Sequence, residues 1–278
     1  MLLPISTTRV CIAPPVEDGC VSDTTPGPAP ESQAQLAVRL SLPLWAPGEV
    51  AGCECGFLLF YDHACLSLQQ NDQNASGPLC VDFEDATLAY RQRHSRQPEA
   101  ILKALGAKQG ESLLIVDATA GWGLDAFVLA SAGHRIDLIE RSVILHALLQ
   151  DGLRRAAASR DERLAVIAER MTLHLGESTL KLQAWGDSLP DVIYLDPMFP
   201  ERRKSAKVKK NMYLLQQMLH DELPTETLLR DALSLARRRV VVKRPAHAGF
   251  LEDIKPSFQL TGKSSRFDIY LTRNSGSG

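Results

Sequence analysis

Between residues 86 and 272, short apolar runs alternate with stretches whose apolar positions recur with a helical period. Apolar runs bounded by polar residues or glycine are typical of strands buried on both faces of a parallel sheet. The intervening stretches predict helices, most clearly over residues 125–132 and 142–158. We expect strands at residues 113–117, 135–139, 171–175, 191–195 and 239–243. This alternation predicts an α/β fold with a doubly wound sheet.

Two further apolar runs, residues 257–261 and 267–272, lie close to the C-terminus. Only a short turn around Gly262–Ser265 separates them, which leaves no room for the crossover that parallel strands require. We therefore expect a C-terminal antiparallel hairpin at one edge of the sheet.

The first 85 residues have a different pattern. Residues 1–35 are rich in proline and polar residues, and we expect them to be extended or loosely ordered. From Gln35 to Phe83, short apolar runs such as LAVRLSLPLW and CGFLLFY are separated by turn formers, which predicts strands. We expect a small N-terminal β-rich module over residues 1–85, a second domain over 86–274, and a flexible tail over 275–278.

Composition narrows the class of protein. The chain has 278 residues, 45% of them hydrophobic and 23% charged, which excludes a disordered or fibrous protein. No apolar run approaches the ~18 residues of a membrane span, and the N-terminal sequence lacks the features of a signal peptide. We expect a cytoplasmic protein that does not associate with membranes.

The net charge of −2 conceals an uneven distribution. Residues 1–85 hold two basic and eleven acidic residues, so the rest of the chain carries +7. The most basic segment is residues 201–210. Such a segment is either an ordinary solvated surface or a surface that binds a phosphate-rich partner such as RNA. In the second interpretation, the basic residues that follow later strands, Lys243, Arg244, Lys263 and Arg266, extend the same surface. The candidate RNA-binding residues are Arg202, Arg203, Lys204, Lys207, Lys209 and Lys210.

All six cysteines lie within the first 80 residues. Cys53, Cys55, His63 and Cys65 have side chains of the kind that bind zinc. Their spacing lacks the usual paired knuckles, which favours reduced thiols and no metal site.

A glycine-containing loop follows the first strand of the second domain. Asp117 ends that strand, Gly121 and Gly123 follow, and a helix is expected to begin at Leu124-Asp125. Glycine allows the backbone to approach a ligand closely, and the N–H groups at a helix start bind anions. Glu140 ends the next strand, where an acid commonly binds ribose hydroxyls. These residues fit a dinucleotide or S-adenosylmethionine (SAM), and the four-residue gap between Asp117 and Gly121 favours SAM.

Two polar sites follow later strands of the same sheet. Glu177 and Ser178 follow the third strand and could contact an adenine or simply cap a helix. The sequence Asp196-Pro-Met-Phe199-Pro follows the fourth and resembles the (Asp/Asn)-Pro-Pro-(Tyr/Phe) loop of methyltransferases that modify amino or amide nitrogens. The carboxylate of Asp196 would orient an amino group whose lone pair is delocalised, and Phe199 would stack on the base. Both are candidate catalytic residues.

Six strings carry a wider resemblance: VDATAGWGLDAFVLASAGH, LIER, YLDPMFP, KSAKVKK, RVVVKRP and RFDIY. In this order, over about residues 81–272, the chain resembles the ribosomal RNA small subunit methyltransferase J family. The resemblance implies a Rossmann-like class I methyltransferase domain that uses SAM to methylate the exocyclic N2 of one guanine in 16S rRNA. The implied partner is 16S rRNA or the small ribosomal subunit. The family's cofactor contacts fall on Leu124, Asp125, Glu140, Arg141, Glu177, Ser178 and Asp196.

The chain departs from the family at three places. Leu124 replaces a usual basic residue, so a contact there would use the backbone. Glu177 replaces the first residue of a Ser-Ser pair, and residues 91–98 replace a glycine-rich stretch. The alternatives are methylation of another nitrogen, in adenine or a protein amide, an NAD-linked dehydrogenase, and a non-catalytic RNA-binding protein.

Overall fold

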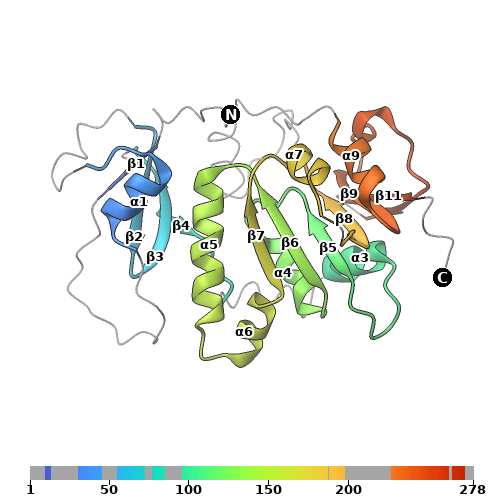
Figure 1. Ribbon diagram of the computed structural model, residues 1–278, viewed down its shortest axis with the longest axis horizontal. Coiled ribbons are helices and arrows are strands. Elements are labelled where there is room, and N and C mark those ends of the chain that lie inside the picture. The colour runs from blue at the N-terminus through green and yellow to red at the C-terminus, as the bar shows by residue number, and fades with distance from the viewer. Residues whose placement is uncertain are drawn as a thin grey trace. The chain divides into compact units, whose positions relative to one another are not determined.

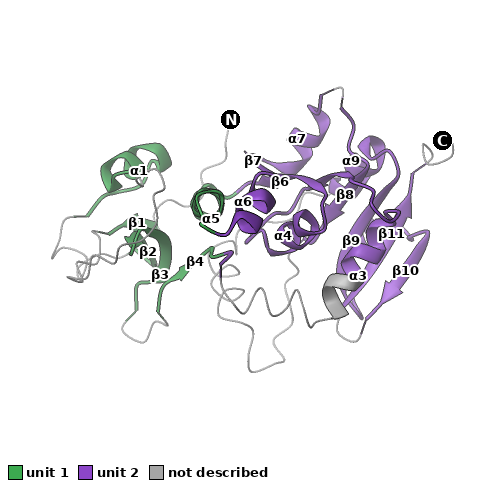
Figure 2. Cartoon of the chain, turned by 90° about the horizontal axis from the view of Figure 1, so that it is seen from below, with its two compact units in different colours: residues 1–82, 142–160, 200–223 green, residues 83–141, 161–199, 224–278 purple. Residues whose placement is uncertain are grey.

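The computed structural model describes residues 10–13, 31–45, 55–72, 77–84, 96–186, 188–197, 227–262 and 265–272. The chain divides into two compact units, coloured separately in Figure 2. The first comprises residues 1–82, 142–160 and 200–223, and the second comprises residues 83–141, 161–199 and 224–278. The domain boundary expected after residue 85 stays a prediction.

The second unit is built on a seven-stranded sheet in the order β10-β11-β9-β8-β5-β6-β7 (Figure 1). The five strands from β9 to β7 are parallel, whereas β11 is antiparallel to both β9 and β10. The doubly wound sheet and its antiparallel edge hairpin are thus confirmed. The strands are β5 (Leu114–Asp117), β6 (Arg135–Glu140), β7 (Met171–Leu175), β8 (Val192–Leu195), β9 (Arg239–Pro245), β10 (Phe258–Thr261) and β11 (Ser265–Leu271).

Helices cover both faces of this sheet. Figure 2 shows α7 (Ser178–Gln183) and α9 (Leu228–Leu235) on one face and α4 (Leu124–Ser131) on the other. Helix α3 (Arg96–Leu105) packs against α4 and against strands β9 and β11. Short α6 (Glu162–Ala168) packs beside α4, and the 3₁₀ turn η3 covers Leu251–Asp253. Among the described residues, no helix is long and apolar enough to cross a membrane.

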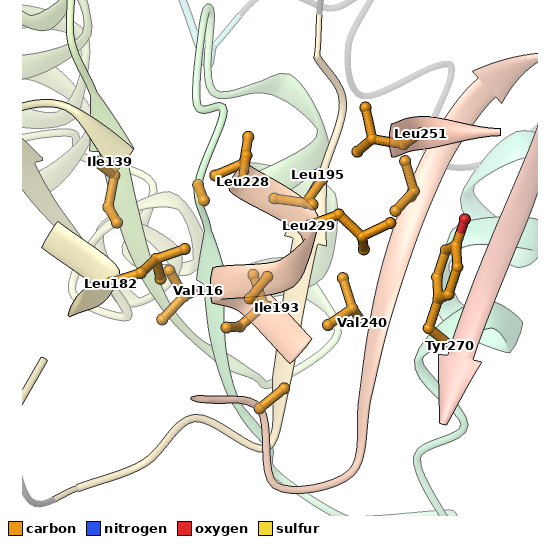
Figure 3. Close-up of a cluster of buried hydrophobic side chains, with 14 residues drawn as sticks. Val116, Ile139, Leu182, Ile193, Leu195, Leu228, Leu229, Val240, Leu251 and Tyr270 are labelled. Carbon is orange, nitrogen blue, oxygen red and sulfur yellow. The ribbon is translucent and has the colours of Figure 1, made fainter. Parts of the chain in front are cut away.

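The core between the sheet and α7 and α9 follows from strand alternation, because every second side chain points to the same face. Val116, Ile193 and Val240 project from three neighbouring strands and are completely buried. They meet Leu182 of α7 and Leu229 of α9 (Figure 3). Asp117 and Tyr194, one residue further along their strands, therefore point to the opposite face, toward α4.

The first unit contains a four-stranded sheet in the order β1-β2-β3-β4. Strand β1 runs parallel to β2, and the remaining pairs are antiparallel. The elements are β1 (Val10–Ile12), α1 (Gln33–Leu40), β2 (Phe57–Asp62), β3 (Cys65–Gln70), β4 (Leu79–Cys80) and α5 (Val143–Ala157).

One local expectation for the first unit was wrong. The first half of the run LAVRLSLPLW lies in helix α1 rather than in a strand, and Ser32 and Gln35 form a reciprocal capping box at the start of that helix. Buried Leu36 and Leu40 lie one helical turn apart, so the run has a helical period that its short length conceals. Residues 10–12, expected to be extended or loosely ordered, form a strand that is at most 1% exposed.

The zinc interpretation concerned residues of this unit. Cys53 lies outside the described residues. In the part of the chain that the structure describes, no group of three or more His, Cys, Asp or Glu side chains could hold a metal ion.

Candidate active site

Strand register brings the predicted site residues together at the carboxyl ends of the parallel strands, which we call the carboxyl edge. Asp117 of β5 pairs with Tyr194 of β8, which pairs with Val241 of β9. Lys243 lies two residues beyond Val241 and therefore shares the face of Asp117 and Tyr194. In open α/β sheets, this edge is where ligands bind.

The loop between β5 and α4 requires its two glycines. Gly121 and Gly123 have φ angles of +53° and +68°, in the left-handed region. Among the described residues, a Cβ on Gly121 would meet only the carbonyl oxygen of Thr119, at 3.9 Å, so these residues leave the space beside the loop open. Gly123 is the N-cap of α4 and supplies no side-chain cap. The N–H groups of the first turn of α4 are thus suited to an anionic ligand.

Glu140 and Ser178 hold this loop in place. Glu140, 6% exposed, accepts a 2.8 Å hydrogen bond from the backbone N–H of Gly121. The hydroxyl of Ser178 donates to the carbonyl of Ala118. Ser178 therefore ties the start of α7 to the end of β5, and its hydroxyl is not a helix cap.

Arg141 and Glu177 lie at the ends of β6 and β7. Their side chains approach to 3.9 Å, with Arg141 29% and Glu177 34% exposed. Glu177 is the N-cap residue of α7, but its side chain makes no capping hydrogen bond. Leu124, at the first position of α4, is 37% exposed. The residues predicted to bind the cofactor thus lie at the ends of β5, β6 and β7 and at the start of α4, except Asp196, which follows β8.

Asp117 is a buried carboxyl group, 2% exposed. Burial raises its pKa to about 7, although the hydrogen bond from the Thr119 N–H opposes the rise. Nearby Asp125 and Asp196 raise it further. A carboxyl group with this pKa titrates near neutral pH, which is typical of functional sites.

Lys243 connects two of the acids. Its Nζ lies 2.6 Å from Oδ2 of Asp125 and 2.9 Å from Oδ2 of Asp196. The hydroxyl of Tyr194 donates a 2.6 Å hydrogen bond to the same Asp125 oxygen. Oγ1 of Thr119 accepts a 2.6 Å hydrogen bond from the backbone N–H of Asp196. Strand ends from β5, β8 and β9 and the start of α4 therefore meet around a single ammonium group.

The charges of this cluster shift two pKa values. Desolvation alone would lower the pKa of Lys243, but Asp196 and Asp125 more than offset it, so the pKa is raised. Desolvation raises the pKa of Asp196 even though 39% of its side chain is exposed, and Lys243 opposes that rise. Lys243 thus favours the ionised form of Asp196.

The interpretation of later basic residues as an extended RNA surface needs correction. Lys243 faces the acids of the carboxyl edge. Arg244 and Arg266 are only 4% and 5% exposed, and Arg266 pairs with Asp268, which is completely buried. Lys263 lies outside the described residues, as do Phe199 and the basic run Arg202, Arg203, Lys204, Lys207, Lys209 and Lys210. Their roles stay predictions.

Comparisons with known proteins agree with this geometry. A family model described as "Putative SAM-dependent methyltransferase" matches residues 49–272. A ribosomal RNA small subunit methyltransferase J from Pseudoalteromonas atlantica is 48% identical over 78% of this chain and 85% of its own length. Another, from Pseudomonas fluorescens, is 48% identical over 88% of this chain and 92% of its own.

A solved structure supports the fold along nearly the whole chain. The crystal structure of the SAM-dependent methyltransferase NGO1261 from Neisseria gonorrhoeae matches with a TM-score of 0.69 at 30% identity. The match covers 96% of this chain and 97% of that one.

Proposed function

The chain belongs to the ribosomal RNA small subunit methyltransferase J family, and from this premise we propose that it methylates the exocyclic N2 of a specific guanine in 16S rRNA, with SAM as methyl donor. The observation that carries the proposal is the contact of Asp196 with Lys243 at the carboxyl edge. The substrate, as free 16S rRNA or within the small ribosomal subunit, is a cytoplasmic RNA, so we place the activity in the cytoplasm. The family assignment disfavours the dehydrogenase alternative.

The residues of the carboxyl edge fit SAM chemically. SAM has an ammonium group, a carboxylate, a sulfonium and a ribose with two hydroxyls. Asp117 and Asp125 offer carboxylates to its cationic groups, and the uncapped start of α4 at Leu124 offers N–H groups to its carboxylate. Glu140 lies where ribose hydroxyls are bound in such sheets. The open space beside Gly121 leaves room for the ligand.

The remaining proposed contacts lie at neighbouring strand ends. Arg141 follows Glu140 at the end of β6, where it would contact the ribose side of the cofactor. Glu177 and Ser178 would contact the adenine edge, Glu177 as the acceptor for an amino group. Asp196 would lie between the cofactor and the target base.

The mechanism that this arrangement supports depends mainly on positioning and charge. SAM, when bound, supplies an electrophilic methyl group on its sulfonium. Asp196 accepts a hydrogen bond from the guanine amino group, which orients that nitrogen and favours the positive charge that develops on it. Lys243 keeps Asp196 ionised, and Thr119 fixes its backbone. Asp196 can then take up the proton that the methylated nitrogen must lose.

Two parts of the proposal rest on sequence. Phe199 would stack on a guanine turned out of its helix. The basic run Arg202, Arg203, Lys204, Lys207, Lys209 and Lys210 would bind phosphates near the target base and make binding salt-sensitive.

The test is incubation of the protein with labelled SAM and small subunits that lack the modification, followed by nucleoside analysis. We expect the label in N2-methylguanosine. Free 16S rRNA, treated in parallel, identifies which form is the substrate. Label in a methylated adenosine or in protein would assign another nitrogen, and RNA binding without label would indicate a non-catalytic protein.

A further inference from the structure

A short loop follows β9 at the carboxyl edge. Because β9 runs parallel to β8, with Val242 the register partner of Leu195, both strands end at this edge. Residues 246–250, which we call the β9 loop, begin directly after Pro245, the last residue of β9. The β9 loop therefore starts close to Asp196, on the side of the sheet away from β6 and β7, whose ends carry proposed cofactor contacts.

Two buried guanidiniums hold carbonyl groups of this segment. Nη1 of Arg266 donates to the carbonyls of Pro245, at 3.2 Å, and Ala246, at 2.8 Å. Nη2 of Arg244 donates to the carbonyl of Gly249 at 2.7 Å, and Nη2 of Arg266 lies 3.3 Å from the same oxygen. The conformation of the β9 loop is thus fixed by side chains beneath it.

This arrangement turns N–H groups of the β9 loop outward. Its peptide bonds are trans, so each N–H points away from the carbonyl of the preceding residue. Because three carbonyls point at the guanidiniums, the N–H groups that follow them, those of Ala246, His247 and Phe250, point away. No hydrogen bond joins the N–H of His247 or Phe250 to another described residue. Successive N–H groups that a turn directs outward form an anion-binding concavity.

The buried charge beneath the β9 loop also favours an anion. Arg244 and Arg266 carry two positive charges, and the completely buried Asp268 that pairs with Arg266 carries one negative charge. These three groups therefore have a net charge of +1, and salt screens buried charges less than exposed ones. His247, at the tip, is exposed, and Phe250 is partly exposed with its ring centroid 5.6 Å from Cζ of Arg266.

We propose that the β9 loop binds a backbone phosphate of the RNA beside the target guanine, through the N–H groups of His247 and Phe250. Arg244 and Arg266 act as positioning residues, which contribute to RNA binding without touching the RNA. The inference rests on the proposed function, because the entry of a guanine at Asp196 brings the phosphates of its nucleotide to this side of the edge. Such a contact fixes the register of the RNA and reads no sequence.

Amide hydrogen exchange of the full-length protein tests the contact without any substitution. We expect 16S rRNA to slow exchange in the peptide that contains residues 246–250 by about tenfold, whereas SAM alone should leave it unchanged. Unchanged exchange with RNA bound would overturn the inference. Slower exchange with SAM alone would also overturn it, because the β9 loop would then respond to the cofactor.

Substitutions test whether the bound group is a phosphate. His247→Glu places a negative charge on the β9 loop and should weaken RNA binding about tenfold, with a log–log salt slope smaller by about one unit. Gln109→Glu adds the same charge at an exposed position before β5, at the opposite edge of the sheet, and should change neither. His247→Ala keeps the main-chain N–H and should retain affinity within about twofold. Equal losses in His247→Glu and Gln109→Glu, or in His247→Glu and His247→Ala, would contradict a main-chain phosphate contact.

These measurements do not depend on methyl transfer, so this inference and the proposed function can fail separately. Formation of N2-methylguanosine with unchanged exchange in the β9 loop would overturn the inference alone. Slower exchange on RNA binding, with no label transferred to guanine, would contradict the proposed function and support the phosphate contact.

Discussion

Nζ of Lys243 lies 2.9 Å from Oδ2 of Asp196, across the neighbouring parallel strands β8 and β9. The contact joins the acid of the Asp196-Pro-Met-Phe199-Pro loop to a lysine that also pairs with Asp125 at the start of α4. One ammonium group therefore links the residue proposed to orient the target amine with a residue proposed to bind the cofactor.

Lys243→Met should slow methyl transfer about 10²-fold at neutral pH, because removing one preorganised charge has effects of this order. Without the ammonium, the pKa of Asp196 rises further, so the acidic limb of the rate profile should move to higher pH. The measurement is single-turnover transfer across a pH series. Lys243→Arg, which retains the charge, is the matched control. A uniform loss of rate with no shift in the profile would make Lys243 merely structural.

Asp117→Asn should flatten the pH dependence of stability. The pKa of Asp117 is raised in the folded protein from 3.8 to about 7, so its contribution is fully present below about pH 3.8 and is lost as pH rises through about 7. The free energy of unfolding of the cofactor-free wild type should therefore fall over this window. Denaturant unfolding at several pH values measures this free energy. If it fell with pH as steeply in Asp117→Asn as in the wild type, Asp117 would be excluded as the cause.

Asp268→Ala should destabilise the second unit by about 3–5 kcal/mol, because it leaves the buried Arg266 guanidinium without its carboxylate. Nε and Nη2 of Arg266 lie 2.9 and 3.1 Å from the two oxygens of Asp268. Chemical denaturation gives the value. Asp253→Ala is a surface-acid comparison and should cost far less.

Replacement of Lys207, Lys209 and Lys210 by alanine should weaken RNA binding and make it less sensitive to salt. The log–log slope of affinity against salt concentration should fall by about one unit for each phosphate that the variant no longer binds. Titrations of 16S rRNA at several salt concentrations measure both effects. Lys103→Ala, from helix α3, is the control for the removal of a positive charge. An unchanged slope would assign the basic run to ordinary solvated surface.

Much of the second unit is predictable from sequence because parallel strands place their carboxyl ends at one edge. Asp117 and Glu140 end recognisable strands, and Glu177 and Asp196 follow two others, so their common location at that edge could be expected. The hydrogen bond from the Gly121 N–H to Glu140 could not be predicted, because it depends on the shape that the loop adopts.

The contacts of Lys243 with the acids of the carboxyl edge were not predicted. A lysine at the end of a strand gives the same sequence pattern whether it faces solvent or a buried acid. The strand register indicates the position of Lys243. Val241 is the register partner of Tyr194, and Lys243, two residues further along β9, must therefore lie on the same face of the sheet as Asp117. Arg266 was misinterpreted because the sequence does not distinguish a solvated arginine from a buried one. In the structure, Arg266 is buried and pairs with Asp268. In the first unit, α1 was missed because its apolar run is too short to distinguish a helix from a strand.

We propose that Asp196 orients the target amine without contributing to RNA affinity. The most direct measurement compares wild type and Asp196→Ala in single-turnover transfer from labelled SAM to unmodified small subunits, with RNA affinity determined in parallel. We expect transfer to fall at least about 10²-fold in Asp196→Ala, while RNA affinity and the unfolding transition stay near those of the wild type. Transfer at the wild-type rate, or loss of RNA binding with retained transfer to a free nucleoside, would contradict it.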